Sequence, residues 1–406
     1  MRACWLIAAF VPACGAQVFT YRGFLDTRTF LYPQTAYNDS GRAVAETLLR
    51  WEPSLRPRSW LRLNASWDGR WDTHRQVERS LRLDWQDRGL RRPAVSVRRL
   101  SAVMNRGPLT LELGKQFIRW GKTDILNPTD RFAPRDFLSV VTNDFLAVPA
   151  ARATVEFPRD TFDLIWQPRF TPSRTPLFNQ RWTVLPAEIR TLPLRDAGAR
   201  YPGGSQFGAR WNHIWRGGEF SASLFEGRQH LPQFDVRFIP LPPSLEFERR
   251  FPRLRLYGAD GALPLRWFTV KGESAYFSAP GRDTDAFIQG VLQLERVAGE
   301  WQFGGGYAGE RVTRRRSALQ FAPERGLATA FLGRASYTID VNRSVLIEFA
   351  ARRNGDGAWV RAEYSQAFGQ HWRATAGFTW IGGQAPDFLG QYHRNSHFSI
   401  AWRYSF

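Results

Sequence analysis

The chain has 406 residues with a formal net charge of +19, and 15% of its residues are aromatic, including 17 tryptophans. Its mean hydropathy is −0.39, and no stretch after the N-terminus supplies the roughly 20 apolar residues of a membrane-spanning helix, which excludes a helical membrane protein. Lys115, Lys122 and Lys271 are the only lysines, so arginine carries nearly all the positive charge. These arginines are spread along the chain and not gathered in one patch, which argues against a nucleic-acid partner.

Residues 1–16 have the layout of a secretory signal peptide. A basic start precedes an apolar segment, and small residues lead to Ala16, after which we predict cleavage. The segment also resembles a lipoprotein cleavage box at Cys14, although Pro12 fits it poorly, so lipidation of Cys14 stays an alternative. The only other cysteine is Cys4, so cleavage after Ala16 leaves a mature chain without disulfide, thiol or cysteine-based metal chemistry.

The rest of the chain repeats one pattern, in which about ten residues alternate between apolar and polar and a turn or polar loop follows, as in transmembrane strands. A weaker candidate strand lies at 79–86. In chain order, the pattern predicts strands at 19–30, 42–52, 58–70, 94–104, 108–120, 149–157, 160–170, 205–216, 218–227, 252–261, 265–278, 284–296, 299–311, 327–339, 343–353, 357–367, 370–381 and 395–406.

Short turns and long connections alternate between these strands. Bacterial single-chain barrels have an even number of strands, short periplasmic turns and long extracellular loops. Nineteen candidates are therefore one too many, and the weak 79–86 is the one to remove. We predict an all-β fold, a transmembrane antiparallel up-and-down β-barrel of 18 strands in a single domain over 17–406, with 16 strands as the alternative. The predicted long loops are 121–148, 171–204, 228–251, 279–283, 312–326 and 382–394.

The alternation of apolar and polar residues is clearest in the last predicted strand, 395–406. Large apolar residues occupy every second position and small or polar ones lie between them, as expected for a strand with lipid on one side and water on the other. This ending resembles the C-terminal signature of bacterial outer-membrane barrels, where the assembly machinery reads the final aromatic residue. The resemblance implies export to the outer membrane; an edge strand of a soluble sandwich is the alternative. The residues of this predicted assembly signal are Phe398, Ile400, Trp402, Tyr404 and Phe406.

The segment 114–136 is the least generic part of the chain. It resembles the R-x-x-W-G-x-x-D…N-P-x-D stretch of porin-like outer-membrane barrel families of unknown function, related in style to alginate-export barrels, except that here the arginine, Arg119, directly precedes Trp120. The resemblance extends to the opening strand at 23–26 and to the aromatic C-terminus. It implies a class of protein but does not identify a substrate. The matching residues are Gln116, Arg119, Trp120, Gly121, Lys122, Asp124, Asn127, Pro128 and Asp130.

A charged loop after Trp120 that folds into the barrel would narrow it, because opposed charges in a constriction set ion selectivity. The alternative is that these charges pair with one another and fix the shape of the loop. The predicted constriction residues are the cations Arg119, Lys122, Arg131 and Arg135 and the anions Asp124, Asp130 and Asp136.

The sequence contains no recognisable catalytic, metal or cofactor motif. His393 and His397 are four residues apart, but at a junction of loop and strand, so they form no helical metal site. We therefore predict no enzyme, no cofactor and no metal, but a channel for small solutes that favours anions if the arginines line its lumen; the alternative is that the preference for arginine over lysine has no functional meaning. An exporter of anionic polysaccharide or lipidic molecules, or a structural or adhesive surface barrel, is the alternative. The expected partners are outer-membrane lipid and lipopolysaccharide phosphates, the barrel-assembly machinery and the solute; homo-oligomerisation is left open.

Overall fold

The computed structural model describes residues 18–124, 126–185, 189–280, 284–315 and 323–406. The predicted signal peptide, including Cys14 and the cleavage position, lies outside the described residues. No helix within the described ranges is long and apolar enough to cross a membrane.

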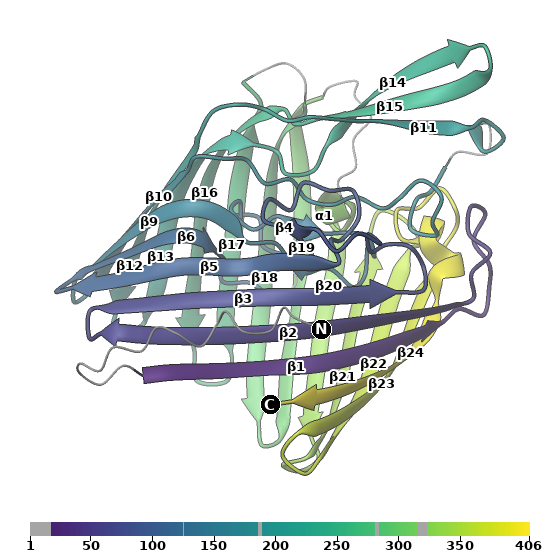
Figure 1. Cartoon of the computed structure of the whole chain (residues 1–406). Coiled ribbons are helices and arrows are strands. Elements are labelled where there is room, and N and C mark those ends of the chain that lie inside the picture. The colour runs from purple at the N-terminus through teal and green to yellow at the C-terminus, as the bar shows by residue number, and fades with distance from the viewer. Residues whose placement is uncertain (1–17, 125, 186–188, 281–283, 316–322) are drawn as a thin grey trace, which may run out of the picture.

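The main sheet has 19 strands, and 18 remain when the two-residue β4 is set aside. Each neighbouring pair among the 18 is antiparallel, and β1 pairs with both β2 and β24, which closes the sheet into a barrel (Figure 1). The first nine barrel strands are β1 (Val18–Leu31), β2 (Ala43–Arg58), β3 (Leu61–Asp72), β5 (Val95–Arg106), β6 (Leu109–Gln116), β9 (Val148–Glu156), β10 (Asp160–Gln167), β12 (Gln206–Trp215) and β13 (Gly218–Arg228).

The second half continues the same order around the barrel. Its strands are β16 (Arg253–Pro264), β17 (Thr269–Ser278), β18 (Ala286–Ala298), β19 (Trp301–Arg314), β20 (Ala330–Thr338), β21 (Arg343–Arg352), β22 (Ala358–Phe368), β23 (Trp372–Gly382) and β24 (His397–Ser405). The smaller elements are β4 (Leu83–Asp84), β7 (Arg135–Asp136), β8 (Asp144–Phe145), β11 (Leu194–Arg200), β14 (Gln233–Pro240), β15 (Pro243–Arg250), α1 (Pro323–Gly326) and the 3-10 helix η2 (Gly390–Asn395).

The predicted fold class and the strand count of 18 are confirmed, and the alternatives of 16 strands and of a soluble sandwich are wrong. Every predicted strand overlaps one barrel strand, and the discarded segment 79–86 contains only β4, which pairs in parallel with β5. The predicted strand at 108–120 is too long, because β6 ends at Gln116 and the chain then leaves the wall. Ile118 and Trp120 are almost fully buried inside the barrel.

Two predicted loops contain strands of their own. The connections 171–204 and 228–251 hold β11, β14 and β15, which form a separate three-stranded sheet in the order β11-β15-β14. This sheet extends beyond the barrel at the end that carries the long loops (Figure 1). Residues 233–250 form a hairpin, and its β15 also pairs in parallel with β11, so these segments fold on one another and not into the barrel wall.

The predicted alternation of faces is confirmed on the outer wall. On β24, the residues Phe398, Ile400 and Trp402 are each about half exposed, whereas His397 and Ala401 on the opposite face are buried. The first and last strands meet at the seam, where Gly23 and Phe406 exchange backbone hydrogen bonds of 2.8 and 3.0 Å. The barrel therefore has an apolar outer face and a polar inner face, as a wall between lipid and water requires.

Candidate functional site: the loop inside the barrel

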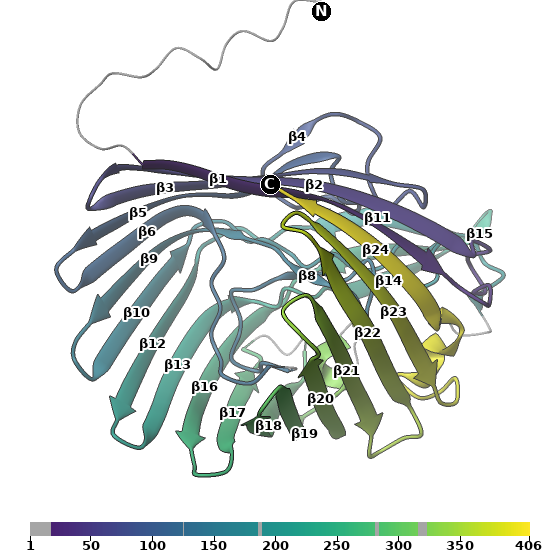
Figure 2. The same ribbon diagram turned by 90° about the horizontal axis from the view of Figure 1, so that it is seen from below.

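The connection from β6 to β9, residues 117–147, is called here the inner loop. Seen from below, it lies within the ring of strands, with β8 near the middle (Figure 2). Its apolar residues Ile118, Trp120 and Phe132 pack in one buried cluster with wall residues of β10, β13, β16 and β17. Gly208 on β12 makes room for this packing, since a Cβ atom there would lie 2.4 Å from the Phe132 ring. Burial of these three side chains holds the loop against the inner wall.

Glu273 on β17 anchors the start of the inner loop. Its carboxylate accepts hydrogen bonds from the backbone N–H groups of Lys122, Thr123 and Thr129, and from the hydroxyls of Thr123 and Thr129, at 2.8 to 3.3 Å. The side chain of Glu273 is 4% exposed. Gly121 lies directly over it, with φ of +95°, and a Cβ atom at Gly121 would be 2.7 Å from both carboxylate oxygens. The glycine of the predicted W-G motif is therefore required by this contact.

The next charged residues of the inner loop pair with side chains on strands across the barrel from β6. Lys122 donates to Glu219 of β13 at 2.6 Å. The Asp124 carboxylate accepts from Gln293 of β18 at 2.6 Å and lies 3.4 Å from the ammonium group of Lys271. Strands β13, β17 and β18 are several positions around the barrel from β6, so these contacts require the loop to run across part of the interior.

Asp130 is the buried carboxylate at the centre of the loop. It accepts a hydrogen bond from the backbone N–H of Trp120 at 3.1 Å and faces the guanidinium group of Arg119 at 3.4 Å. Burial raises the pKa of Asp130 to about 6, against the lowering effects of the Trp120 hydrogen bond and Arg119. Asp130 therefore changes its charge near neutral pH, which an exposed aspartate does not do.

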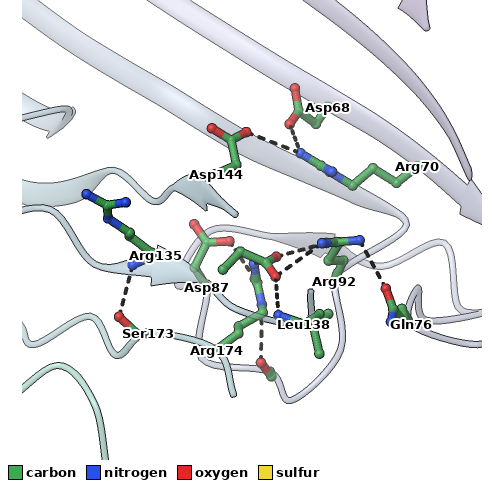
Figure 3. A network of polar contacts seen from close by, with 12 residues as sticks. Asp68, Arg70, Gln76, Asp87, Arg92, Arg135, Leu138, Asp144, Ser173 and Arg174 are labelled. Atoms are coloured by element: carbon green, nitrogen blue, oxygen red, sulfur yellow. Dashed lines mark hydrogen bonds and ion pairs between the residues drawn. The ribbon is translucent and has the colours of Figure 1, made fainter. Parts of the chain in front are cut away.

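Asp136 belongs to a buried network that ties the inner loop to two other loops. Its carboxylate accepts from Arg92 at 2.9 Å and lies 3.1 Å from Arg174. Figure 3 shows Asp87, Arg92 and Arg174 of this network close together. Arg174 also binds Asp87 at 2.8 Å, and Asp87 in turn binds Lys115 at 2.5 Å. Burial acts to raise the pKa of Asp136, but the guanidinium groups of Arg92 and Arg174 outweigh it and hold the pKa well below its usual range. The network stays charged at any physiological pH.

Arg131 and Arg135 lie over aromatic rings. The Arg131 guanidinium is 5.1 Å from the centre of the Phe277 ring, and that of Arg135 is 4.3 Å from the Phe145 ring. Arg135 also donates to the side-chain oxygen of Asn143 at 3.1 Å. These contacts help to fix the directions of both cations.

Two cavities flank the inner loop. One, of about 270 Å³, lies between loop residues 139–144 and the wall formed by β1, β2, β3 and β24. The other, of about 210 Å³, lies on the side of β21 and β22 and is lined by Asp130, Arg131 and Arg135 together with apolar side chains. Six arginines and three carboxylates line the first cavity: Arg28, Arg50, Arg70, Arg92, Arg181 and Arg403 against Asp26, Glu46 and Asp144.

No family model matches the sequence, and neither does any curated protein. Solved structures do match. A BenF-like porin from Pseudomonas fluorescens Pf-5 superposes with a TM-score of 0.56 at 6% identity, over 96% of this chain and 98% of that chain. OccAB4 of Acinetobacter baumannii gives 0.54 at 8% identity, over 95% and 97%. OccK3 of Pseudomonas aeruginosa gives 0.53 at 12% identity, over 95% of each. The chain is a porin-like 18-stranded β-barrel.

Within this porin-like barrel, the seven predicted constriction residues do not form one opposed set. Arg119 and Asp130 face each other, as the alternative of mutual pairing expected. Lys122, Asp124 and Asp136 instead pair with residues outside the loop. Arg131 and Arg135 line the cavity beside β21 and β22. Their role in a constriction stays a prediction.

Sequence reasoning missed the partners that hold the porin-like barrel's inner loop. Glu273, Glu219 and Gln293 have no local signal beyond their inward position on alternating strands, since each lies about 100 or more residues from its loop partner. Lys115 lies inside the segment 114–136, but a single lysine at a strand end carries no local signal of its buried ion pair with Asp87. Within the described residues, no group of three or more histidine, cysteine, aspartate or glutamate side chains could hold a metal ion.

Proposed function

We propose that this protein is a channel of the bacterial outer membrane that passes small solutes and favours anions. The closed 18-stranded barrel with an apolar outer face supports the location, because such a barrel satisfies its backbone within lipid. Barrels of this size can enclose an aqueous lumen that loops narrow. Export by the signal at residues 1–16 and insertion by machinery that reads Phe406 belong to the same proposal.

The observation that carries the proposal is the arginine-rich cavity between the inner loop and β1, β2, β3 and β24. Five of the six arginines are ion-paired, Arg403 to Asp26 and the others to Asp39, Asp68 or Asp136 behind the lining, so the uncompensated positive charge of this space comes from Arg28. Arg28 is half-buried there and forms no ion pair with any of the residues that the structure describes. An excess of cations on a low-dielectric wall concentrates anions and raises their rate of entry.

Reconstitution of the purified, folded protein into a planar lipid bilayer tests this function. We expect discrete conductance steps and, under a salt gradient, a reversal potential on the anion-selective side. A folded barrel that never opens conductance steps would contradict the channel, and a cation-selective channel would contradict the anion preference.

A second candidate, an adhesive surface barrel, is supported by the three-stranded sheet β11-β15-β14. This sheet stands clear of the barrel at the end with the long loops (Figure 1) and exposes Val236, Phe238 and Leu241. Deletion of residues 233–250 separates the two functions: loss of surface attachment with unchanged conductance favours adhesion, whereas unchanged attachment excludes it.

A further inference from the structure

The outer wall of β13 and β16 carries unneutralised arginines where the strands meet the long loops. Arg228 ends β13 and Arg253 begins β16, and the two are directly opposed in the strand register. Both lie on the face of their strands that also bears Leu224 and Tyr257, which are 44% and 51% exposed, whereas Phe225 on the opposite face of β13 is fully buried. The two arginines therefore point away from the lumen.

Neither Arg228 nor Arg253 forms an ion pair with any residue in the described ranges. Arg255, two residues further along, is paired with Glu226 at 3.1 Å. We call Arg228, Arg253 and Arg255 the outer arginine cluster. With Glu226 included, it has a net charge of +2, from three cations and one anion.

An aromatic row lies below the outer arginine cluster. Tyr257 and Tyr276 are opposed in the register and stack with ring centres 6.4 Å apart. Tyrosines of this kind mark the boundary between acyl chains and headgroups. Arg253 is four residues beyond Tyr257, which is about 13 Å along the strand and about 9 Å in height for a strand tilted by about 45°. The cluster therefore stands at the level of lipid phosphates.

A groove of about 530 Å³ opens on the same wall, on the face of β16 to β19 that points away from the lumen. Its floor is one register row of small residues, in which Ala259 opposes Ser274, Ser274 opposes Gly290, and Gly290 opposes Gly309. The larger side chains of Phe220 and Leu292 border it. The groove lies next to the tyrosine row and below the arginines, so a molecule with a charged head and an apolar tail can occupy both.

We propose that this wall binds a phosphorylated glycolipid of the outer leaflet, with phosphate on Arg228 and Arg253 and an acyl chain in the groove. Guanidinium groups bind phosphate through paired N–H donors, and the apolar floor accepts hydrocarbon. A two-fold dimer through this face is disfavoured, because such an interface would bring the outer arginine cluster against itself. The inference rests on the proposed outer-membrane location but not on conduction.

Native mass spectrometry of the full-length protein in detergent, titrated with bisphosphorylated lipid A, tests this site. We expect the wild type to retain lipid A in preference to phosphatidylethanolamine. The double variant Arg228→Ala/Arg253→Ala should bind lipid A about 25-fold more weakly than the wild type, because each arginine contributes about fivefold to affinity at a membrane surface. Arg296→Ala removes one charge from the outer face of the same wall at its other end and should leave the affinity unchanged.

Gly290→Leu tests the groove independently of charge. A Cβ atom at Gly290 would meet nothing closer than 3.6 Å, so the barrel tolerates the substitution while the leucine fills the groove. We expect weaker lipid A binding with an unchanged melting temperature. Lipid A affinity that is equal in the wild type and the arginine double variant would overturn the proposal. So would displacement of the lipid by inorganic phosphate alone, or cross-linking of two chains through Gly290→Cys. A protein that binds lipid A but opens no conductance steps would contradict the channel and leave this inference standing.

Discussion

Thr129 donates both its backbone N–H and its hydroxyl to one carboxylate oxygen of Glu273, each at 2.8 Å. The two residues are 144 positions apart, one in the inner loop and one on β17. Together with the contacts of Lys122 and Thr123 to the second oxygen, this pairing makes one buried side chain the main polar anchor of the loop. The position of the loop, and therefore the free cross-section of the barrel, depends on Glu273.

Glu273→Ala should release the inner loop. Five hydrogen bonds to a buried carboxylate are lost and their donors are left without a partner, which should cost about 3 kcal/mol or more. We expect a lower melting temperature and a higher, noisier single-channel conductance in planar bilayers. Glu226→Ala, on the outer wall, is the matched control and should change neither. Wild-type conductance in Glu273→Ala would show that the loop does not limit the channel.

Gly121→Ala should have a similar effect through the backbone. The residue has φ of +95°, and a Cβ atom would lie 2.7 Å from the Glu273 carboxylate, so the loop must move. We expect a loss of about 2 kcal/mol in the free energy of unfolding. Gly272→Ala is the control, since no atom lies within 4 Å of the Cβ position there. Equal melting temperatures for the two variants would contradict the argument.

The wall of this barrel follows from local rules, whereas the inner loop does not. The period of two on β24 gives the direction of Trp402 without any knowledge of its neighbours. The pairing of Arg119 with Asp130 is within reach of sequence reasoning, because the two are only 11 residues apart. Glu273 is different: the pattern places it inside the barrel, but its partners are set by how the loop packs. That packing depends on Phe132 fitting against Gly208, a contact that no local signal contains.

The ion selectivity should depend on pH through Asp130. Burial raises its pKa from 3.8 to about 6. Protonated Asp130 makes its full contribution to the free energy of unfolding below about pH 4, and this contribution is lost as the pH rises through about 6. Lowering the pH from 7.5 to 5 should therefore remove one negative charge from the channel and increase anion selectivity, measured as the reversal potential.

Asp130→Asn should abolish this pH dependence and show the low-pH selectivity throughout. Asp136→Asn is unsuitable as a control because it breaks the buried network. A pH response in Asp130→Asn equal to that of the wild type would assign the effect to another group.

The arginines of the two cavities should set the size of the anion preference. Arg28→Ala removes a cation that has no ion pair with any described residue, and Arg131→Ala/Arg135→Ala removes the two beside the second cavity. Each change should shift the reversal potential toward cations. Arg296→Ala, on the outer wall, should not. A value unchanged by Arg131→Ala/Arg135→Ala would place these two residues outside the ion path, while an effect of Arg28→Ala alone would place the path along β1.

Phe406 should serve both the seam and the assembly of the barrel. Its backbone exchanges two hydrogen bonds with Gly23, and its ring covers Gly23 so closely that a Cβ atom there would lie 2.6 Å from it. Deletion of Phe406 should reduce the folded protein recovered from the outer membrane of cells, measured by heat-modifiable migration in gels, more than it reduces unassisted folding into liposomes.

Gly23→Val separates the two roles of Phe406, since it displaces the ring but keeps the terminal residue. We expect this variant to lose stability in both settings, because the seam is disturbed whether or not machinery is present. Phe378→Ala removes an aromatic ring of comparable exposure from the outer wall and is the control for lost apolar surface. Deletion of Phe406 could instead impair folding equally in cells and in liposomes, as Gly23→Val does. Phe406 would then act only by closing β1 onto β24. Recognition by the assembly machinery would have to depend on other residues of the last strand.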